Sequence, residues 1–374
     1  MTLLSETALI DRIFEHIDGK TTDVGDDVWQ EPTENYRSQD RFDAEVALMR
    51  RLPVAFCPSA ALPKPGSFIA RTAAMVPILA VRDDDGVVRA FRNACRHRGM
   101  PVAQEGEGCH RSFVCPYHAW TYGLDGKLKH VPGEEGFPDL DKATHGLVPV
   151  TAEEHGGLVF VTQDEPLSGG ALEDMPDLIA PDQAMFNTIE FTDKANWKLF
   201  AETFMEGYHI KALHTKSFYP YGYDNLNIVE TFGRNSRIVF PFQRIEKLRD
   251  KPRAEWCAQG LITDVYQLFP NTLVVELSNH AMLVVLEPIS VSETKTVVYQ
   301  FSLTAKGGEE IDLVAAKRDA SFVQDDGLIE DRNAACAIQT GLETNANSHF
   351  TFGKFEKMIC HFHKNLTEHV EMPR

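Results

Sequence analysis

Two short clusters of cysteine and histidine constrain this chain more than any other feature. Cys95 and His97 form a CxH pair, and Cys115 and His118 form a CxxH pair further along the sequence. Two thiolates and two imidazoles in this arrangement can hold an inorganic cluster between two loop tips. The segments around both pairs resemble short strands, so we expect a rigid sheet that presents the two loops. The mixed ligand set separates this predicted site from the commoner sites built from cysteine alone.

A structural zinc ion is the alternative occupant, because zinc sites use the same residue types. The spacing favours iron, since zinc fingers and ribbons prefer CxxC or HxxxH pairs and CxH is unusual among them. In a Rieske [2Fe–2S] centre, two thiolates hold one iron and two imidazoles hold the other. Pro116 and the aromatic residues Tyr117 and Trp120 would shield one side of such a cluster. The pattern therefore predicts an electron-transfer site.

The stretch CRHRG…CPYHAWTYGLDGKL resembles the Rieske domain of the ring-hydroxylating, non-haem iron oxygenases. Rieske proteins of respiratory complexes are similar, but they place an extra cysteine in each loop to form a disulfide. This chain has Met100 and Tyr117 at those positions, which favours the oxygenase branch. The resemblance implies one [2Fe–2S] cluster per chain, with the two cysteines and two histidines of the CxH and CxxH pairs as its ligands.

A second pair of histidines lies in the C-terminal half of the chain. His209 and His214 are five positions apart, so an ideal helix would not place both on one face, and a local distortion or a helix end is required. Two imidazoles and one carboxylate on one face of an iron form the facial triad of non-haem Fe(II) oxygenases. Taken alone, a histidine pair five positions apart is more often non-ligating, as surface or core histidines on an acidic helix. The Rieske motif upstream favours iron binding.

The stretch NWKLFAETFMEGYHIKALH resembles a second signature of the same oxygenase family. That resemblance implies that His209 and His214 bind a mononuclear Fe(II), one per chain. It places Glu206 at the position of a bridging carboxylate, which links a histidine of the mononuclear site, here His209, to His118 of a neighbouring subunit. Many relatives have aspartate at this position, and the longer glutamate occurs in some, including enzymes that act on quaternary amines.

The third iron ligand is expected among acidic residues near the C-terminus, because the facial triad requires a carboxylate. An acidic helix face is usually only solvated, so composition alone leaves several candidates open. The motif Glu330-Asp331 followed by Ile338-Gln339-x-Gly341-Leu342 resembles the ED…VQxGL segment of the family, whose aspartate binds iron. We therefore choose Asp331 among the five candidates, which are Asp319, Asp325, Asp326, Glu330 and Asp331.

The character of the sequence changes three times along the chain. Residues 1–45 are predicted to be a helical segment that packs on the catalytic domain. Short strands and turns fill residues 46–163, which we assign to the Rieske domain. Residues 164–184 are rich in Gly, Pro, Asp and Glu and form a predicted linker. Residues 185–374 form the predicted catalytic domain with the mononuclear iron.

We expect an α+β fold overall, with an all-β Rieske domain. Within that domain, 76–81 and 87–91 are predicted to pair as a β-hairpin across the turn sequence DDDG. The catalytic domain is expected to hold an antiparallel sheet packed against a long C-terminal helix at 311–341, in a helix-grip-like arrangement. A second helical stretch is predicted at 195–214. The strands predicted for the sheet are 238–242, 265–269, 272–278, 282–286 and 296–303.

Composition limits the remaining classes of function. The formal net charge is −18 at pH 7, which argues against nucleic-acid binding because phosphate contacts need clustered Lys and Arg. No apolar run approaches the roughly 20 residues of a membrane helix. The N-terminus carries Glu6, Asp11 and Arg12 among its apolar residues, which is not typical of a secretory signal. Seven scattered cysteines indicate reduced thiols, and we expect a cytoplasmic protein.

Together, the two resemblances imply the terminal component of a multicomponent Rieske non-haem iron oxygenase. They imply that electrons come from a separate NAD(P)H-dependent reductase or ferredoxin and that O2 is used at the mononuclear iron. No GxGxxG sequence follows a predicted strand, so the reductase is expected on another polypeptide. The family is built from trimers, so the resemblance implies a homotrimer. It leaves open whether a β subunit is also present. The alternatives are a Rieske electron carrier without oxygenase activity and a zinc-stabilised ligand-binding protein.

The substrate is left open by the sequence. Residues 217–226, SFYPYGYDNL, follow the second histidine pair directly and are rich in aromatic side chains. These rings can stack on an aromatic substrate, surround a methylated ammonium group, or simply fill the core. The family performs monohydroxylation, cis-dihydroxylation and oxidative demethylation on one scaffold, so a small aromatic or quaternary ammonium substrate fits the resemblance.

Overall fold

The computed structural model describes residues 3–167, 172, 175–304 and 311–372, and part of the predicted linker at 164–184 lies outside these residues. The chain forms two compact units. One unit contains residues 49–181, and the other combines residues 1–48 with residues 182–374. Helices and antiparallel sheets are both present, as the predicted α+β class requires. Among the described residues, no helix combines the length and apolar character needed to cross a membrane.

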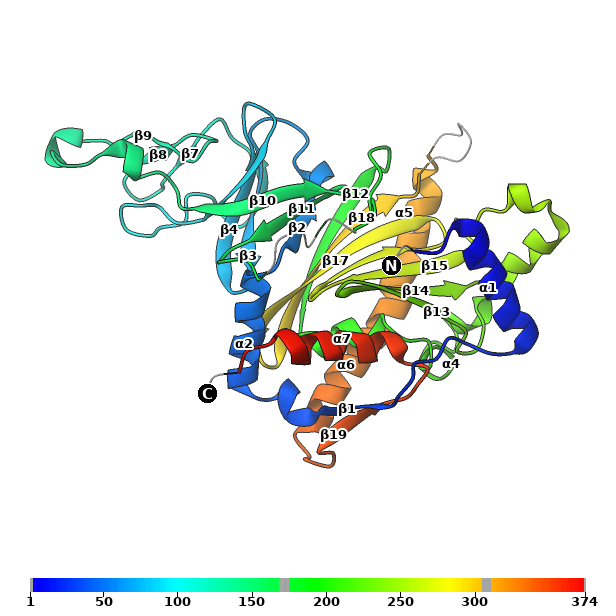
Figure 1. The fold of residues 1–374 in the computed structure, drawn as a ribbon. Coiled ribbons are helices and arrows are strands. Elements are labelled where there is room, and N and C mark those ends of the chain that lie inside the picture. Colours follow the sequence, from blue (N-terminus) through cyan, green and yellow to red (C-terminus); the bar gives the residue numbers. More distant parts are fainter. Residues whose placement is uncertain (1–2, 168–171, 173–174, 305–310, 373–374) are drawn as a thin grey trace. The chain divides into compact units, whose positions relative to one another are not determined.

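The 49–181 unit is built from antiparallel strands (Figure 1). Its larger sheet has the order β2-β11-β10-β5-β4-β3-β6, and a small sheet has the order β7-β8-β9. The predicted hairpin is confirmed, since β4 and β5 pair in register. The strands are β2 (Val54–Pro58), β3 (Ser67–Ala73), β4 (Val76–Arg82), β5 (Val88–Arg92), β6 (Gly106–Cys109), β7 (Phe113–Val114), β8 (Thr121–Tyr122), β9 (Leu128–His130), β10 (Pro149–His155) and β11 (Leu158–Thr162).

The turn of this hairpin is stabilised by an aspartate. The carboxylate of Asp83 accepts hydrogen bonds from the backbone N–H groups of Asp85 and Val87. Gly86 has φ +79°, a left-handed conformation that favours glycine. The turn therefore fixes the register of two strands whose inward side chains, Leu79 and Phe91, belong to the core of this unit.

The second unit contains a seven-stranded antiparallel sheet with the order β12-β18-β17-β16-β15-β14-β13. Helix α5 (Leu313–Phe322) contacts β17 and β18, and α7 (Lys357–His369) contacts β13 and β14. Helix α3 (Trp197–Thr203) contacts β17 and α6 (Leu328–Leu342). The strands are β12 (Met185–Asp193), β13 (Ile228–Phe232), β14 (Asn235–Pro241), β15 (Ile262–Leu268), β16 (Thr272–Glu276), β17 (His280–Ser290) and β18 (Glu293–Ser302).

The N-terminal segment, predicted to be helical, contains two helices and a short strand between them. Helix α1 (Glu6–Gly19) buries Ile10 and Ile13 against residues of β13 and β14. The chain then forms a short strand, β1 (Trp29–Pro32), and a second helix, α2 (Gln39–Arg50). Strand β1 pairs with β19 (His349–Phe352) near the opposite end of the chain. That pairing is long-range, so the local helical pattern could not indicate it.

The predicted C-terminal helix runs without a gap from α5 to α6 but contains an irregular turn. A π-helical turn, Val323–Gly327, separates α5 from α6, and such turns are frequent at functional sites. The stretch 195–214 is divided, into α3 and a single turn, α4 (Ile210–Leu213). The segment 204–209 between them is not helical. Both irregular segments lie beside the residues predicted to bind the mononuclear iron.

Candidate metal centres

The loops that carry the CxH and CxxH pairs have the same backbone geometry. In each, the cysteine N–H donates to the carbonyl five residues later, and the cysteine carbonyl accepts the N–H four residues later, with N···O distances of 2.8–2.9 Å. The fourth residue after each cysteine is left-handed, Gly99 with φ +77° and Ala119 with φ +58°. The two loops thus present their side chains in equivalent ways, although one of them accepts a strained alanine.

The four side chains converge. Cys95 and Cys115 are buried and form no disulfide. The Nδ1 atoms of His97 and His118 lie 3.1 Å apart. Two nitrogen atoms at that separation can share one metal ion, to which each would bond at about 2 Å. The two thiols are buried, the His97 ring is half-buried and the His118 ring is exposed. This arrangement, with the sulfur atoms inward and the rings outward, fits a Rieske cluster.

Neighbouring side chains support this arrangement. The hydroxyl group of Tyr122 lies 3.2 Å from Cys95 Sγ, and hydrogen bonds to cluster sulfurs tune the potential. The indole of Trp120 stacks on the His97 ring with centroids 5.0 Å apart. Burial, then the charges of His118 and Arg98, lower the pKa of His97. A lowered pKa favours the neutral imidazole, which is the form that binds a metal.

The second candidate centre lies in the other unit. The ligand atoms of His209, His214 and Asp331 all lie within 4.8 Å of one another. His214 Nε2 is 3.1 Å and His209 Nε2 is 3.5 Å from Asp331 Oδ1. His209 precedes α4 and His214 follows it, so both rings flank one helical turn. The five-residue spacing is therefore accommodated by the ends of a short helix, and Asp331 is contributed by α6.

Two further carboxylates contact the Nδ1 atoms of the two imidazoles, on the side of each ring away from Asp331. Glu206 Oε1 contacts His209 Nδ1, and Glu330 Oε2 lies 2.7 Å from His214 Nδ1. Ser217 Oγ donates to the same Glu330 oxygen at 2.5 Å. Both rings are thereby oriented with Nε2 toward Asp331, the tautomer that a metal ligand needs. This role of Glu330 and Ser217 was not predicted, because it depends on how the helix and the loop pack.

The other acidic candidates for the third ligand, Asp319, Asp325 and Asp326, lie outside the group formed by His209, His214 and Asp331. Asp319 Oδ2 accepts the N–H of Asn279 and lies 2.8 Å from His280 Nδ1. Asp325 and Asp326 are exposed within the π-helical turn. Of the five candidates, the structure brings only Asp331 into the cluster formed by the described residues.

The electrostatics of the second centre suit a cation. Burial alone would lower the pKa of His209, but its bonds to Asp331 and Glu206 outweigh burial and raise the pKa to about 10. Burial would raise the pKa of Asp331, and the two imidazoles outweigh it and lower that pKa. Each imidazole thus lies between two carboxylates. A largely buried group of donors with this excess of negative charge fits a divalent metal ion.

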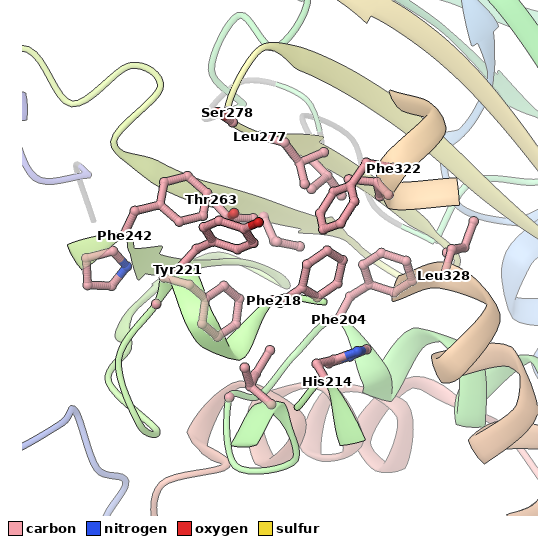
Figure 2. A pocket seen from close by; sticks show the side chains of 18 of the residues that line it. Phe204, His214, Phe218, Tyr221, Phe242, Thr263, Leu277, Ser278, Phe322 and Leu328 are labelled. Carbon is pink, nitrogen blue, oxygen red and sulfur yellow. The ribbon is translucent and has the colours of Figure 1, made fainter. Parts of the chain in front are cut away.

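A cavity of about 480 Å³ opens onto the second centre. Aromatic side chains form much of its wall, and Figure 2 shows them gathered next to His214. Phe218 lies with its ring centroid 4.7 Å from that of His214. From the aromatic stretch at 217–226, Phe218, Tyr221 and Tyr223 line the cavity, whereas Tyr219 does not. The volume is typical of a small-molecule site.

The π-helical turn makes room for one of these rings. A Cβ atom at Gly327, the last residue of the turn, would lie 2.0 Å from Cζ of Phe218. Only glycine therefore lets the Phe218 ring pack against the helix and beside His214. The sequence showed this glycine inside a helical pattern, but its contact with a residue more than a hundred positions earlier is a tertiary feature.

Two family models match the chain. Residues 53–144 match the Rieske [2Fe–2S] domain. Residues 184–372 match the ring hydroxylating alpha subunit (catalytic domain).

Curated relatives match over part of their length. The glycine betaine monooxygenase oxygenase subunit of Chromohalobacter salexigens is 36% identical over 162 residues, 41% of this chain and 36% of that protein. The carnitine monooxygenase oxygenase subunit of Escherichia coli K12 is 31% identical over 199 residues, 50% of this chain and 53% of that protein. The chain thus spans about a third to a half of these relatives. Choline monooxygenase of Spinacia oleracea is 27% identical over 316 residues, 80% of this chain and 69% of that protein.

Solved structures share the fold over nearly the whole chain. The quaternary ammonium Rieske monooxygenase CntA in complex with L-carnitine superposes with a TM-score of 0.78 at 21% identity, covering 99% of this chain and 100% of that chain. Naphthalene 1,2-dioxygenase from Rhodococcus sp. bound to indole superposes with a TM-score of 0.73 at 16% identity, covering 98% and 99%. At these identities the similarity establishes the architecture.

Proposed function

We propose that this chain, which belongs to the Rieske-type ring-hydroxylating oxygenase alpha-subunit family, is the terminal oxygenase component of a multicomponent system. Membership implies a Rieske [2Fe–2S] cluster and a mononuclear iron. The observation that carries the proposal is the largely buried group of His209, His214 and Asp331 at the wall of an aromatic cavity. An electron carrier would need no such cavity beside a second metal centre.

Each group of residues has a distinct task in this proposal. When bound, the [2Fe–2S] cluster supplies one-electron transfer and the mononuclear iron supplies activation of O2. Cys95, Cys115 and the two loop histidines would hold the cluster, and His209, His214 and Asp331 would hold the iron through Nε2 and carboxylate atoms. Glu206 and Glu330 accept hydrogen bonds from the Nδ1–H groups and keep the imidazoles in the metal-binding tautomer. The aromatic walls exclude water and hold the substrate carbon beside the centre.

Glu206 has a second proposed role, as a bridge between subunits. We propose that its carboxylate links His209 to His118 of a neighbouring copy in a homotrimer. Its contact with His209 Nδ1 and the exposure of His118 in its own unit support this role. Glu206→Gln removes the negative charge, so turnover should fall strongly while both metals stay bound. Near-normal turnover in this variant, measured against the exposed-site control Glu343→Gln, would contradict the bridge.

The electron donor and the location are also proposed. We expect a separate NAD(P)H-dependent reductase or ferredoxin to reduce the Rieske cluster, because membership of this family implies such a partner. None of the seven cysteines, all of which the structure describes, forms a disulfide, which supports a reducing compartment such as the cytoplasm. The mass of the native assembly will show whether a β subunit joins the homotrimer.

The proposed substrate is a small compound with a methylated ammonium group, which the enzyme would hydroxylate or oxidatively demethylate. Aromatic faces attract such cations, and Glu206, Asp319 and Asp331 add negative charge to the wall of the cavity. The glycine betaine and carnitine monooxygenase relatives support the same class. A second candidate is ring hydroxylation or dihydroxylation of a small aromatic compound, which the apolar walls favour.

The deciding experiment is a substrate screen. Purified protein, a surrogate reductase, NADH and O2 are mixed with methylammonium or aromatic compounds, and the products are identified by mass spectrometry. We expect about three irons per chain and an oxygenated or demethylated product. A protein that holds only zinc would overturn the proposal. A His209→Ala variant with unchanged O2-dependent turnover would show that the second centre is not catalytic.

A further inference from the structure

We propose that the substrate carries a carboxylate at the end remote from the carbon that reacts, and that Arg244 and Arg318 bind it. This inference rests on the proposed function, because it concerns the same cavity. Both arginines line the cavity. Within the part of the chain that the structure describes, neither forms an ion pair with a carboxylate.

The absence of a carboxylate partner is unusual among the described arginines of this unit. The chain carries 55 acidic residues against 37 lysines and arginines, so an arginine readily finds a carboxylate. Other arginines in the same unit do so: Arg237 with Asp264, Arg249 with Asp18, Arg253 with Asp11 and Arg332 with Asp193. Two guanidinium groups thus line one cavity without a carboxylate of the protein beside them. This indicates that the ligand itself carries the anion.

Arg244 is held in place for this task. Its Nε and Nη2 atoms donate to the carbonyl of Gly260, and Nη2 also donates to Ser278 Oγ at 2.6 Å. The guanidinium lies over the Phe242 ring, 4.5 Å from its centroid. Among the described residues, Nη1 has no hydrogen-bond partner. A fixed guanidinium with a free Nη1 group binds a carboxylate with little loss of side-chain entropy, and the two opposite charges strengthen that hydrogen bond.

The separation of Arg318 from Asp331 along the helix indicates an elongated ligand. Arg318 and Asp331 lie thirteen residues apart on the continuous α5–π–α6 helix, which is roughly 20 Å along its axis. An arginine side chain spans several ångströms of that distance. Between the two positions, Phe322, Val323 and Leu328 line the cavity. The cavity therefore has a metal end, an apolar middle and a polar end, which matches an elongated molecule.

A carboxylate of the protein at the polar end does not compete for these arginines. Asp319 also lines the cavity, but its Oδ2 atom is engaged by His280 and by the backbone N–H of Asn279. The charge of Asp319 is thus partly compensated by its own neighbours. Among the described residues at this end, the Nη1 group of Arg244 and the guanidinium of Arg318 have no carboxylate partner.

Calorimetric binding to the iron-loaded protein under argon tests the inference without turnover. The probes are trimethylammonium carboxylates with increasing numbers of methylene groups between the two charges, each compared with its methyl ester. We expect the acids to bind about 10- to 100-fold more tightly than the esters, with the preference largest for the longer members. The preference should fall towards one in Arg318→Gln, which is an exposed position, and in Arg244→Gln. It should persist in Arg253→Gln, which removes an arginine outside the cavity wall.

The outcomes separate the two proposals. Equal binding of acid and ester to the wild-type protein, no binding of any probe, or a preference that survives both variants would overturn the role of the arginines. If the preference is found but no probe gives a product with the surrogate reductase, NADH and O2, the proposed activity fails while the carboxylate site stands. If acids and esters are converted with equal KM, the activity stands and the carboxylate site fails.

Discussion

The two candidate metal centres differ in where their residues come from and in what surrounds them. The centre in the 49–181 unit uses Cys95, His97, Cys115 and His118, four residues on two neighbouring loops with matching backbone hydrogen bonds. The centre in the other unit combines His209 and His214 with Asp331, which lies 117 positions after His214. His118 is exposed, whereas His214 and Asp331 are buried.

The difference follows from the task proposed for each centre. A cluster that receives electrons from another protein benefits from imidazoles at the surface, carried by loops that hold their own shape. A centre that uses O2 benefits from a cavity that excludes water. The loop centre therefore depends mainly on local hydrogen bonds, and the interior centre depends on packing between distant segments. Changes in one unit should leave the other centre intact.

The largest expected effects come from removing one ligand in each unit. His214→Ala should abolish turnover and remove one of about three irons per chain, with the visible spectrum of the cluster retained. Cys115→Ser should remove that spectrum and also abolish turnover, with the mononuclear iron retained. Metal analysis and visible absorption of both variants check this, with the exposed thiol variant Cys109→Ser as the control. Loss of both metal sites in either variant would show that the centres are not independent.

The same contrast decides how much of the molecule could be predicted from the sequence. The β4–β5 hairpin is set by a turn sequence and adjacent strands, so its prediction is confirmed. The loop centre was likewise indicated by residues that lie close together in the chain. The pairing of β1 with β19 was not predicted, because it joins segments near opposite ends of the chain. Helix α7 was also not predicted, although its buried apolar residues repeat at helical spacing.

The interior centre was predicted only in part, for the same physical reason. The spacing of His209 and His214 required a break in the helix, and the structure has α4 between them. Asp331 was chosen by resemblance, and no pattern in the sequence distinguished the role of its neighbour Glu330. Consecutive residues on a helix point in different directions, so here one reaches Nε2 and the other Nδ1 of the same imidazole. That geometry depends on the rotation of α6, which local sequence does not determine.

Glu330 provides the next largest test of the interior centre. Glu330→Gln keeps the size of the side chain but removes the charge that orients the His214 ring. Loss of such an outer carboxylate typically lowers metal affinity or activity 10- to 100-fold, so turnover or iron affinity should fall by about that factor. Titration of the metal-free protein with Fe(II) and steady-state kinetics measure the two quantities. The exposed-site variant Glu343→Gln should match the wild type, and an unchanged Glu330→Gln would show that the ring needs no such support.

A smaller effect is expected at the π-helical turn. Gly327→Ala places a Cβ atom 2.0 Å from the present position of Phe218 Cζ, so the ring or the helix must move. Overpacking of this kind costs about 1–3 kcal/mol, which thermal unfolding of the 182–374 part should report, together with a raised KM. The control is Gly341→Ala on α6, where a Cβ atom meets nothing within 4 Å. If both alanine variants behave alike, the space beside Gly327 does not position Phe218.

The smallest effect is expected in the hairpin of the other unit, at Asp83. Burial would raise the pKa of Asp83, but the bonds from Val87, Arg89 and Asp85 outweigh it and lower the pKa. A lowered pKa stabilises the fold above the ordinary carboxyl value, and this contribution disappears as the pH falls through the folded value. Asp83→Asn should therefore cost about 1 kcal/mol at neutral pH and progressively less in acid, measured as thermal loss of the visible cluster spectrum. The exposed neighbour variant Asp84→Asn is the control, and a pH-independent difference between Asp83→Asn and the wild type would show that the charge of this turn does not stabilise the hairpin.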